Sequence, residues 1–412
     1  MRKWKKSTKQ LKKGTMRKVV YIALAVAAVA SCAPKEKTLK SALEGKFLIG
    51  AAINEQEIRG ISEQADSVLF RHFNAISPEN CLKSGEVLPE YGGEYNWELA
   101  DAYVQFGEDH NLWTLGHCLV WHSQLTKGFC TDEEGNLVDA ETLKARMKDH
   151  ITTIVTRYKG KIDGWDVVNE AIMEDGSYRE SQFYQILGKE FIPWAFECAH
   201  EADPDVELYY NDYNMHEPGK RATVVELIRD LKARGLRIDA VGMQSHVGMD
   251  YPDFDEYKAS MDAFIAEGVD VAITEWDMSA LPTITMSADV SQNMGALFRF
   301  RFFPGQPQKE LTEEEKAELD KALADFDAEF NPYKEGLPEE VSAAWNARMK
   351  QFMDLYIEKA DHISRVTAWG ITDATSWKNG FMSPVLRTDY PLLFGRDYQA
   401  KPFIQELIDN SK

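Results

Sequence analysis

The sequence alternates between short runs that favour β-strands and longer stretches with helical periodicity, and it does so eight times. The expected strands are residues 47–53, 72–77, 112–121, 164–170, 207–212, 240–246, 271–277 and 365–373. Amphipathic segments such as DAETLKARMKDHITTIVTRYKG, GKRATVVELIRDLKARG and DEYKASMDAFIAEG lie between them. Eight apolar strands separated by covering helices favour an α/β fold of the (β/α)8 TIM-barrel type over an open sheet.

The length fits one domain of this kind, which we expect over residues 45–408. The chain between the seventh and eighth expected strands is long and contains the charged stretch KELTEEEKAELDKALADFDAEF. We expect an acidic helical insert around residues 303–335. Its apolar content is too low for a core of its own, so a surface helix is predicted rather than a second domain.

The first 31 residues are typical of a secretory signal, with a basic stretch followed by the short apolar run VVYIALAVAAVAS. Small residues precede Cys32, as in the lipoprotein box of bacteria, and we therefore expect Cys32 to be lipidated and to become the first mature residue. An ordinary signal peptide with a cysteine nearby is the alternative. Residues 32–44 would form a tether, and the protein would be exported and lipid-anchored to the bacterial envelope at the outer membrane. Translation could start at Met1 or at Met16.

The chain is strongly acidic once the signal is removed. Residues 1–31 hold nine of the 47 basic residues and none of the 67 acidic ones, which leaves 38 against 67 and a net charge of −29. Such a chain is repelled by nucleic acid and by anionic lipid, so no nucleic-acid partner is expected, and contact with a membrane would be only through the lipid at Cys32. No Cys/His metal spacing occurs, and we expect neither a metal nor a cofactor. Buried free thiols are predicted for Cys118 and Cys198.

Six of the expected strands end in polar or aromatic side chains. In chain order these are His117, Trp121 and His122; Asn169 and Glu170; Asn211, Asp212 and Tyr213; Gln244 and His246; Glu275, Trp276 and Asp277; and Trp369, Asp373 and Trp377. Solvation would explain any single strand end. Six together predict a site, because the active site of a barrel enzyme lies at the carboxyl ends of its strands.

Two glutamates on different strands, Glu170 and Glu275, suit hydrolysis of a glycosidic bond, which needs one acid and one carboxylate. Indoles stack on the apolar faces of sugar rings, and amides and imidazoles match sugar hydroxyls. Two neighbouring carboxyl groups also push their pKa values apart, so that one stays protonated near neutral pH. The sequence contains no HExxH, GxGxxG or GxSxG motif that would indicate another chemistry.

Seven segments across residues 45–405 carry a further signal: FNAISPENCLK, GHCLVWHSQ, GWDVVNEAI, LYYNDYN, VGMQSHV, ITEWD and WGITDATSWKNG. Together and in this order they resemble the motifs of glycoside hydrolase family 10, the endo-β-1,4-xylanases. The resemblance implies a retaining hydrolase of internal β-1,4-xylosidic bonds of xylan, with Glu170 as the general acid/base and Glu275 as the nucleophile. It implies xylan and xylo-oligosaccharides as partners, and a monomer is expected.

The resemblance also assigns substrate contacts. Asn169 matches the amide that binds the sugar 2-hydroxyl, and Gln244 lies near Glu170 in the family pattern. His246 and Asp277 match the groups that orient Glu275. The remaining matches are His117 and Lys83 for hydroxyls next to the scissile bond, Glu79 and Asn80 for the subsite beyond, Trp121, Trp369 and Trp377 as indoles around the glycone, Tyr213 as an aromatic on the leaving-group side, and His246 as a further substrate contact.

Two positions depart from the family pattern. Ser84 stands where the family usually has an indole, and Trp276 stands where a leucine usually follows the nucleophile. We expect these changes to affect the outer subsites, and hence product length.

Two other functions are compatible with parts of the sequence. A related retaining barrel glycosidase would act on another β-glucan or on mixed substrates, but the order of the motifs argues against it. A glycan-binding protein with an inactive barrel would have lost Glu170, Glu275 or Asn169, and all three are present.

Overall fold

The computed structural model describes residues 36–283, 297, 311–380, 383 and 385–411. The expected signal segment, the lipidation site Cys32 and the first part of the expected insert, residues 303–310, lie outside the described residues.

The described chain contains a closed barrel of eight parallel strands, as the alternating sequence pattern predicts. The strands are β1 (Leu48–Ile53), β2 (Ala75–Pro78), β3 (Trp113–Trp121), β4 (Gly164–Asn169), β5 (Glu207–Asp212), β6 (Ala240–Met243), β8 (Asp270–Ser279) and β9 (Ile363–Ala368). Consecutive strands pair, and the pairs β1–β9 and β6–β8 close the ring. A short strand, β7 (His246–Gly248), follows β6 and pairs in parallel with the last residues of β8. The predicted (β/α)8 fold is confirmed.

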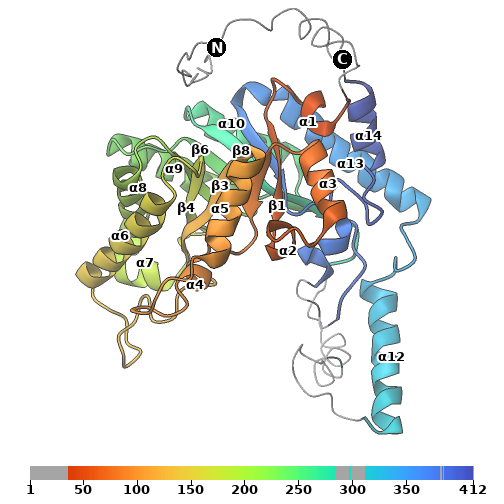
Figure 1. Cartoon of the computed structure of the whole chain (residues 1–412), viewed down its shortest axis with the longest axis horizontal. Helices are drawn as coiled ribbons and strands as arrows, with labels where there is room; N and C mark the ends of the chain where they lie inside the picture. Colours follow the sequence, from red (N-terminus) through yellow and green to blue (C-terminus); the bar gives the residue numbers. More distant parts are fainter. Residues whose placement is uncertain (1–35, 284–296, 298–310, 381–382, 384, 412) are drawn as a thin grey trace, which may run out of the picture. The chain divides into compact units, whose positions relative to one another are not determined.

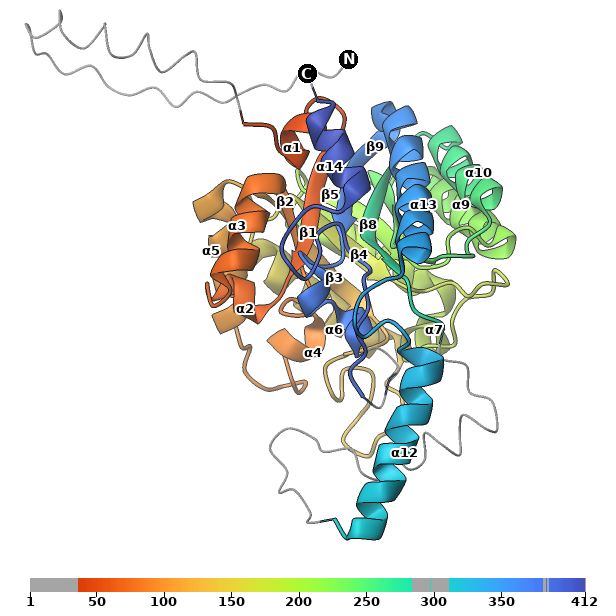
Figure 2. The same ribbon diagram turned by 90° about the vertical axis from the view of Figure 1, so that its right-hand side faces the viewer.

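Helices surround the sheet (Figures 1 and 2). The longer ones are α3 (Glu63–His72), α5 (Glu98–His110), α6 (Ala140–Arg157), α8 (Phe191–Ala202), α9 (Pro218–Ala233), α10 (Phe254–Ala266) and α13 (Glu339–Glu358), and short helices α2 (Glu55–Ile58), α4 (Ser84–Val87), α7 (Gln182–Leu187) and α14 (Pro402–Asp409) lie in the connections or at the end. Local signals set their bounds: Asp139 caps α6 through a 2.8 Å bond from the Thr142 amide, and Pro218 opens α9.

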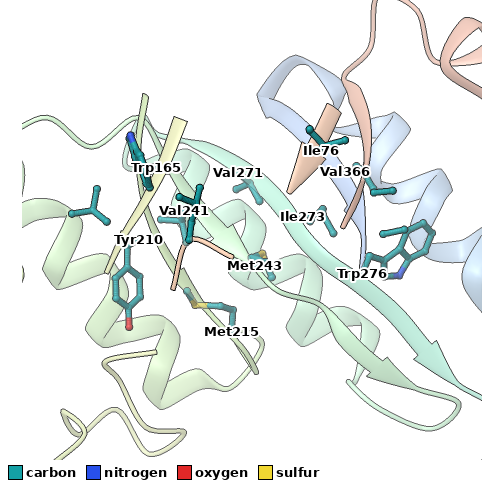
Figure 3. Packing of buried hydrophobic residues seen from close by; sticks show 14 of the residues in the cluster. Ile76, Trp165, Tyr210, Met215, Val241, Met243, Val271, Ile273, Trp276 and Val366 are labelled. Atoms are coloured by element: carbon teal, nitrogen blue, oxygen red, sulfur yellow. The ribbon is translucent and has the colours of Figure 1, made fainter. Parts of the chain in front are cut away.

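The strands bury one face against the helices. Trp276 lies on this face, which contradicts the expectation that it affects an outer subsite. Its indole is fully buried, among the core residues that Figure 3 shows. It packs edge-to-face on Tyr356, with ring centroids 5.3 Å apart, and lies near Phe403 at 6.5 Å. Trp276 therefore fills the core between β8, α13 and α14 and does not line the cleft. The expectation that it changes an outer subsite is wrong, because alternate side chains of a strand point to opposite faces.

The barrel begins earlier than the sequence indicates. Helix α1 (Leu39–Ala42) lies inside the expected tether of residues 32–44, and Leu39 and Leu43 are fully buried in the main core. Contacts join α1 to α3 and α14. Residues from Thr38 onward therefore belong to the barrel unit, so residues 38–44 are not part of a tether.

The charged insert contains helix α12 (Glu313–Phe330), which starts with a capping box formed by Thr312 and Glu315. One face of the helix is apolar and forms a small cluster separate from the main core, built on Leu297, Ala322, Phe326 and Phe330, with Leu319, Leu323 and Val385 packed against it. The acidic side chains occupy the other positions. The helix is thus amphipathic and not solvated all round.

The four cysteines of the described residues, Cys81, Cys118, Cys130 and Cys198, are buried free thiols, which confirms the prediction for Cys118 and Cys198. Burial raises the pKa of Cys81 to about 12, so this thiol resists ionisation. No helix in the described part of the chain has the length and hydropathy needed to span a membrane.

Candidate active site

The predicted site residues gather at the carboxyl ends of the strands. His117 and Trp121 lie on β3, Asn169 ends β4 and Glu170 follows it, Tyr213 follows β5, Gln244 follows β6, His246 begins β7, Glu275 and Asp277 lie on β8, Trp369 follows β9 and Trp377 lies in the next turn, while Glu79, Asn80 and Lys83 follow β2. Strand register places Trp121 beside Asn169 and Asn169 beside Asn211. Hydrogen bonds, ion pairs and ring contacts connect these residues around one rim.

Glu170 sits in a left-handed backbone conformation, with φ of 57°. Such a conformation costs a non-glycine residue roughly 1–3 kcal/mol and persists only where the surroundings hold it. Here the Glu170 amide donates to the Asn211 carbonyl at 2.9 Å, and the Glu170 carbonyl accepts from Arg179 Nε at 2.9 Å. The carboxyl group accepts from Gln244 Nε2 at 3.0 Å and from Trp121 Nε1 at 2.9 Å. Both oxygens are thereby fixed in position.

Glu275 is the more buried of the two carboxyl groups, with 5% exposure. One oxygen accepts from Asn211 Nδ2 at 2.8 Å, and the other lies 3.1 Å from His246 Nε2. Burial alone would raise the pKa of Glu275, but the hydrogen bond from His246, the imidazoles of His117 and His246 and the bond from Asn211 lower it. Glu275 is therefore held ionised.

Asn169 joins the surroundings of the two carboxyl groups. Its Oδ1 accepts from Asn211 Nδ2 at 2.9 Å and from Gln244 Nε2 at 3.3 Å, and these amides also bind Glu275 and Glu170. Thr274 in turn donates to Asn211 Oδ1 at 2.6 Å, which fixes the orientation of that amide. The three amides thus form one hydrogen-bonded unit between the carboxyl groups.

His246 stands between two carboxylates. Its Nδ1 forms an ion pair with Asp277 Oδ1 at 3.0 Å, and its Nε2 faces Glu275 at 3.1 Å. Burial lowers the pKa of His246, but the charge of Asp277 and the contacts with both carboxylates outweigh it and raise the pKa to about 9. Asp277 is fully buried, and burial would raise its pKa, but His246 and Lys378 lower it.

The side of the site formed by β2 and β3 carries the other predicted polar groups. His117 is buried and its Nδ1 lies 2.8 Å from Asp166 Oδ2, which orients the imidazole. Lys83 Nζ donates to Asn80 Oδ1 at 2.9 Å and to Gln124 Oε1 at 2.7 Å, and it lies 4.9 Å from the Trp121 ring centroid. The lysine therefore links the residues after β2 to the indole on β3.

Glu79 and two indoles complete this side. Glu79 is half-buried, and burial raises its pKa although Lys83 opposes the rise. Trp369 is buried and packs edge-on against His117, with centroids 5.6 Å apart. Trp377 lies 4.9 Å from the His246 ring and donates its Nε1–H to Asp277 Oδ2 at 2.7 Å. Two of the predicted indoles, Trp121 and Trp377, thus also hold carboxyl groups.

Tyr213 lies on the other side of Glu170. Its hydroxyl accepts from Arg179 Nη2 at 2.6 Å, and Lys220 Nζ lies 4.1 Å from the ring centroid. Arg179 is the same residue that binds the Glu170 carbonyl. This guanidinium therefore connects Tyr213 to the backbone of Glu170.

Sequence reasoning missed several residues of the site. Asn211 stood among the polar strand ends but received no role, although it binds Glu275 directly. Asp166 lies within a strand that reads as apolar, and Arg179 and Lys378 lie in connections without periodicity. Of these residues, only Asp166 could be found from the sequence, because a charged residue within an apolar strand is costly to bury without a partner.

Within the described ranges, no group of three or more His, Cys, Asp and Glu side chains is arranged to hold a metal ion.

Comparison with known proteins shows the family of the chain. The model of the glycosyl hydrolase family 10 matches residues 38–410. The chain is similar to endo-1,4-beta-xylanase A of Xylanibacter ruminicola, with 43% identity over 92% of this chain and 95% of the relative. It is similar to endo-1,4-beta-xylanase A of Halalkalibacterium halodurans, with 35% identity over 90% and 86%, and to a thermostable celloxylanase of Thermoclostridium stercorarium, with 33% identity over 91% and 88%.

Solved structures are similar as well. A GH10 endoxylanase retrieved from sugarcane soil metagenome superposes with a TM-score of 0.77 and 37% identity, covering 92% of this chain and all of the other. A GH10 structure from Paenibacillus barcinonensis has a TM-score of 0.72 and 31% identity, covering 92% and 98%.

The raised pKa of His246 predicts how stability depends on pH. A folded pKa of about 9 against an ordinary value near 6.5 stabilises the fold below pH 6.5, and this contribution is lost as pH rises through 9. The excess unfolding free energy of the wild type over His246→Asn should therefore shrink by roughly 3 kcal/mol between pH 6 and pH 10. Urea denaturation of both proteins across this range measures it. A constant difference would contradict the assigned charge of His246.

Proposed function

The chain belongs to glycosyl hydrolase family 10, and on that premise we propose that it is an endo-1,4-β-xylanase that cleaves internal β-1,4-xylosidic bonds of xylan with retention of configuration. The observation that carries the proposal is the pair Glu170 and Glu275. Glu170 directly follows β4, Glu275 lies on β8, and the amides of Asn169, Asn211 and Gln244 join them. These amides support two carboxyl groups in unlike surroundings, which is what a two-carboxylate mechanism needs.

In the first step Glu275 attacks the anomeric carbon while the bond to the leaving oxygen breaks. Glu170 gives its proton to that oxygen, and a covalent glycosyl-enzyme ester forms on Glu275. The hydrogen bonds from His246 and Asn211 support this role, because they keep Glu275 ionised before the attack. Asn169 carries amide donors for the sugar 2-hydroxyl, a bond that gains strength in the transition state.

In the second step water replaces the ester. Glu275 is then neutral, so the proton affinity of Glu170 falls and Glu170 can take a proton from the attacking water. The water oxygen bonds to the anomeric carbon, the ester bond breaks, and Glu275 leaves as the carboxylate. Trp121 and Gln244 hold Glu170 in one place for both of its tasks.

The remaining predicted residues form the sugar-binding surface. Glu79, Asn80, Lys83 and His117 offer polar groups next to the indoles of Trp121, Trp369 and Trp377, and Tyr213 offers a ring on the leaving-group side. Because xylose lacks the hydroxymethyl group of glucose, crowded indoles favour xylan over glucans on steric grounds. A broader β-glycanase is the second candidate, since one relative is a celloxylanase.

Export and lipid anchoring through Cys32 at the bacterial outer membrane belong to the same proposal. The basic and apolar stretches before Cys32 support it. Anchoring would hold a monomeric enzyme at the envelope while it releases xylo-oligosaccharides.

Removing the lipidation site tests the anchor. Cys32→Ala should abolish fatty-acid attachment, and the protein should leave the membrane fraction, because the anchor is its expected hold on the membrane. Labelling with a fatty acid followed by fractionation measures both effects in cells that express the natural gene. A wild-type protein without label would contradict the anchor and favour the ordinary signal peptide.

A panel of polysaccharides tests the activity. The purified protein should release short xylo-oligosaccharides from arabinoxylan and glucuronoxylan and little from mixed-linkage glucan or carboxymethylcellulose. Chromatography of the products gives the answer. Equal rates on the glucans would move the assignment to a broader β-glycanase, and no release from any polysaccharide by a folded protein would overturn the proposal.

Two substitutions separate the roles of the carboxyl groups. Glu170→Ala should lower the rate on xylan by at least roughly a hundredfold and largely spare the first step on an aryl xylobioside with a good leaving group, which needs little acid assistance. Glu275→Ala should lose both activities. Steady-state and burst kinetics on both substrates measure this, and equal losses for Glu170→Ala on the two substrates would contradict the acid role.

A further inference from the structure

Four charged side chains form a row that ends on Glu275. Lys378 Nζ lies 3.4 Å from Asp277 Oδ1, the same oxygen lies 3.0 Å from His246 Nδ1, and His246 Nε2 lies 3.1 Å from Glu275 Oε2. The charges alternate in sign along this row. The first member, Lys378, comes from the short turn Trp377–Asn379 after β9, and the pattern of strand ends gave it no role.

Lys378 is a buried member of this row rather than a surface lysine. It is 8% exposed, and its Nζ lies 4.8 Å from the centroid of the Trp377 ring. A lysine that is buried to this degree needs a carboxylate beside it. Asp277 is that carboxylate, and it is itself fully buried.

The contacts of Asp277 leave it little freedom to rotate. One oxygen faces the two cations Lys378 and His246, and the other accepts the Trp377 indole hydrogen at 2.7 Å. Rotation of the carboxylate would break contacts on both oxygens. Since Asp277 fixes the Nδ1 side of His246, it also fixes the direction of Nε2 toward Glu275.

We propose that Lys378 is a positioning residue for the nucleophile, which holds Asp277 and, through Asp277 and His246, sets the orientation and the ionisation of Glu275. This inference rests on the proposed function of Glu275. Lys378 does not touch the reacting atoms in this role. Its effect reaches them through two intervening side chains.

Several charged groups face this row and share in its electrostatics. Lys378 lowers the pKa of both Asp277 and His246, although burial is the largest influence on each. Burial raises the pKa of Tyr251, in the connection after β7; the charge of Lys378 lowers this pKa, and the charges of Asp277, Asp250 and Asp389 raise it. His117 faces Glu275 from β3. Removing the Lys378 cation should therefore move the ionisation of the row to higher pH, because every other member loses a nearby positive charge.

A pH profile tests the proposal on the reaction. With an aryl xylobioside, Lys378→Met should lower kcat/KM at the optimum roughly tenfold, because the nucleophile loses its fixed direction. The acidic limb of the profile should move up by roughly half to one pH unit. Lys378→Arg keeps the cation and should return the limb to its wild-type position. A matched control is Lys359→Met, because Lys359 is also a mostly buried lysine paired with an aspartate, Asp262, but lies at the end of α13.

NMR of the histidine side chains tests the proposal about Lys378 independently of catalytic activity. The imidazole 15N shifts of His246, assigned with His246→Asn, should titrate near pH 9 in the wild type and roughly half to one unit higher in Lys378→Met. An unchanged titration would overturn the proposal, as would an acidic limb that stays in place or one that Lys359→Met moves equally. A wild type that cleaves no polysaccharide would instead overturn the proposed function, and the NMR titration would still decide the role of Lys378.

Discussion

A carboxylate buried in the mouth of a barrel is the constraint around which the rest of this molecule is arranged. Glu275 is 5% exposed. Burying an ionised carboxylate costs roughly several kcal/mol unless hydrogen bonds and opposite charges compensate the lost hydration. Asn211 and His246 supply the direct compensation, and Asp277 raises the pKa of His246 so that the imidazole stays charged. Asp277 is itself a fully buried charge, so it needs compensating contacts of its own.

The closed parallel barrel makes this compensation possible, because it brings the ends of distant segments to one rim. Asn211 lies at the last residue but one of β5 and Gln244 follows β6, and these two strands lie between β4, which Glu170 follows, and β8, which carries Glu275. The amides therefore stand between Glu170 and Glu275 without any local sequence relation to them. An open sheet of the same strands would leave its first and last members apart, and β1 would not meet β9.

The same strands also separate two kinds of packing. On β8, Glu275 and Asp277 face the site, while Trp276 between them fills the core against Tyr356. The apolar face is rigid because it is fully packed, and that rigidity supports the strained backbone of Glu170 and the fixed directions of its neighbours. A large side chain next to the nucleophile thus contributes to stability rather than to the shape of the cleft.

The sequence by itself determined the barrel, its helices and the residues at the strand ends, because periodicity and strand-end polarity are local properties. The resemblance of its motifs to the family also predicted roles for Glu170 and Glu275. Only the tertiary structure decided which polar residues meet: that Asn211 binds Glu275, that Trp121 and Trp377 donate to carboxyl groups, and that Lys378 faces Asp277. It also decided that Trp276 points away from the cleft and that residues 38–43 belong to the barrel. These facts depend on the direction of side chains and on contacts across the ring, which no single segment encodes.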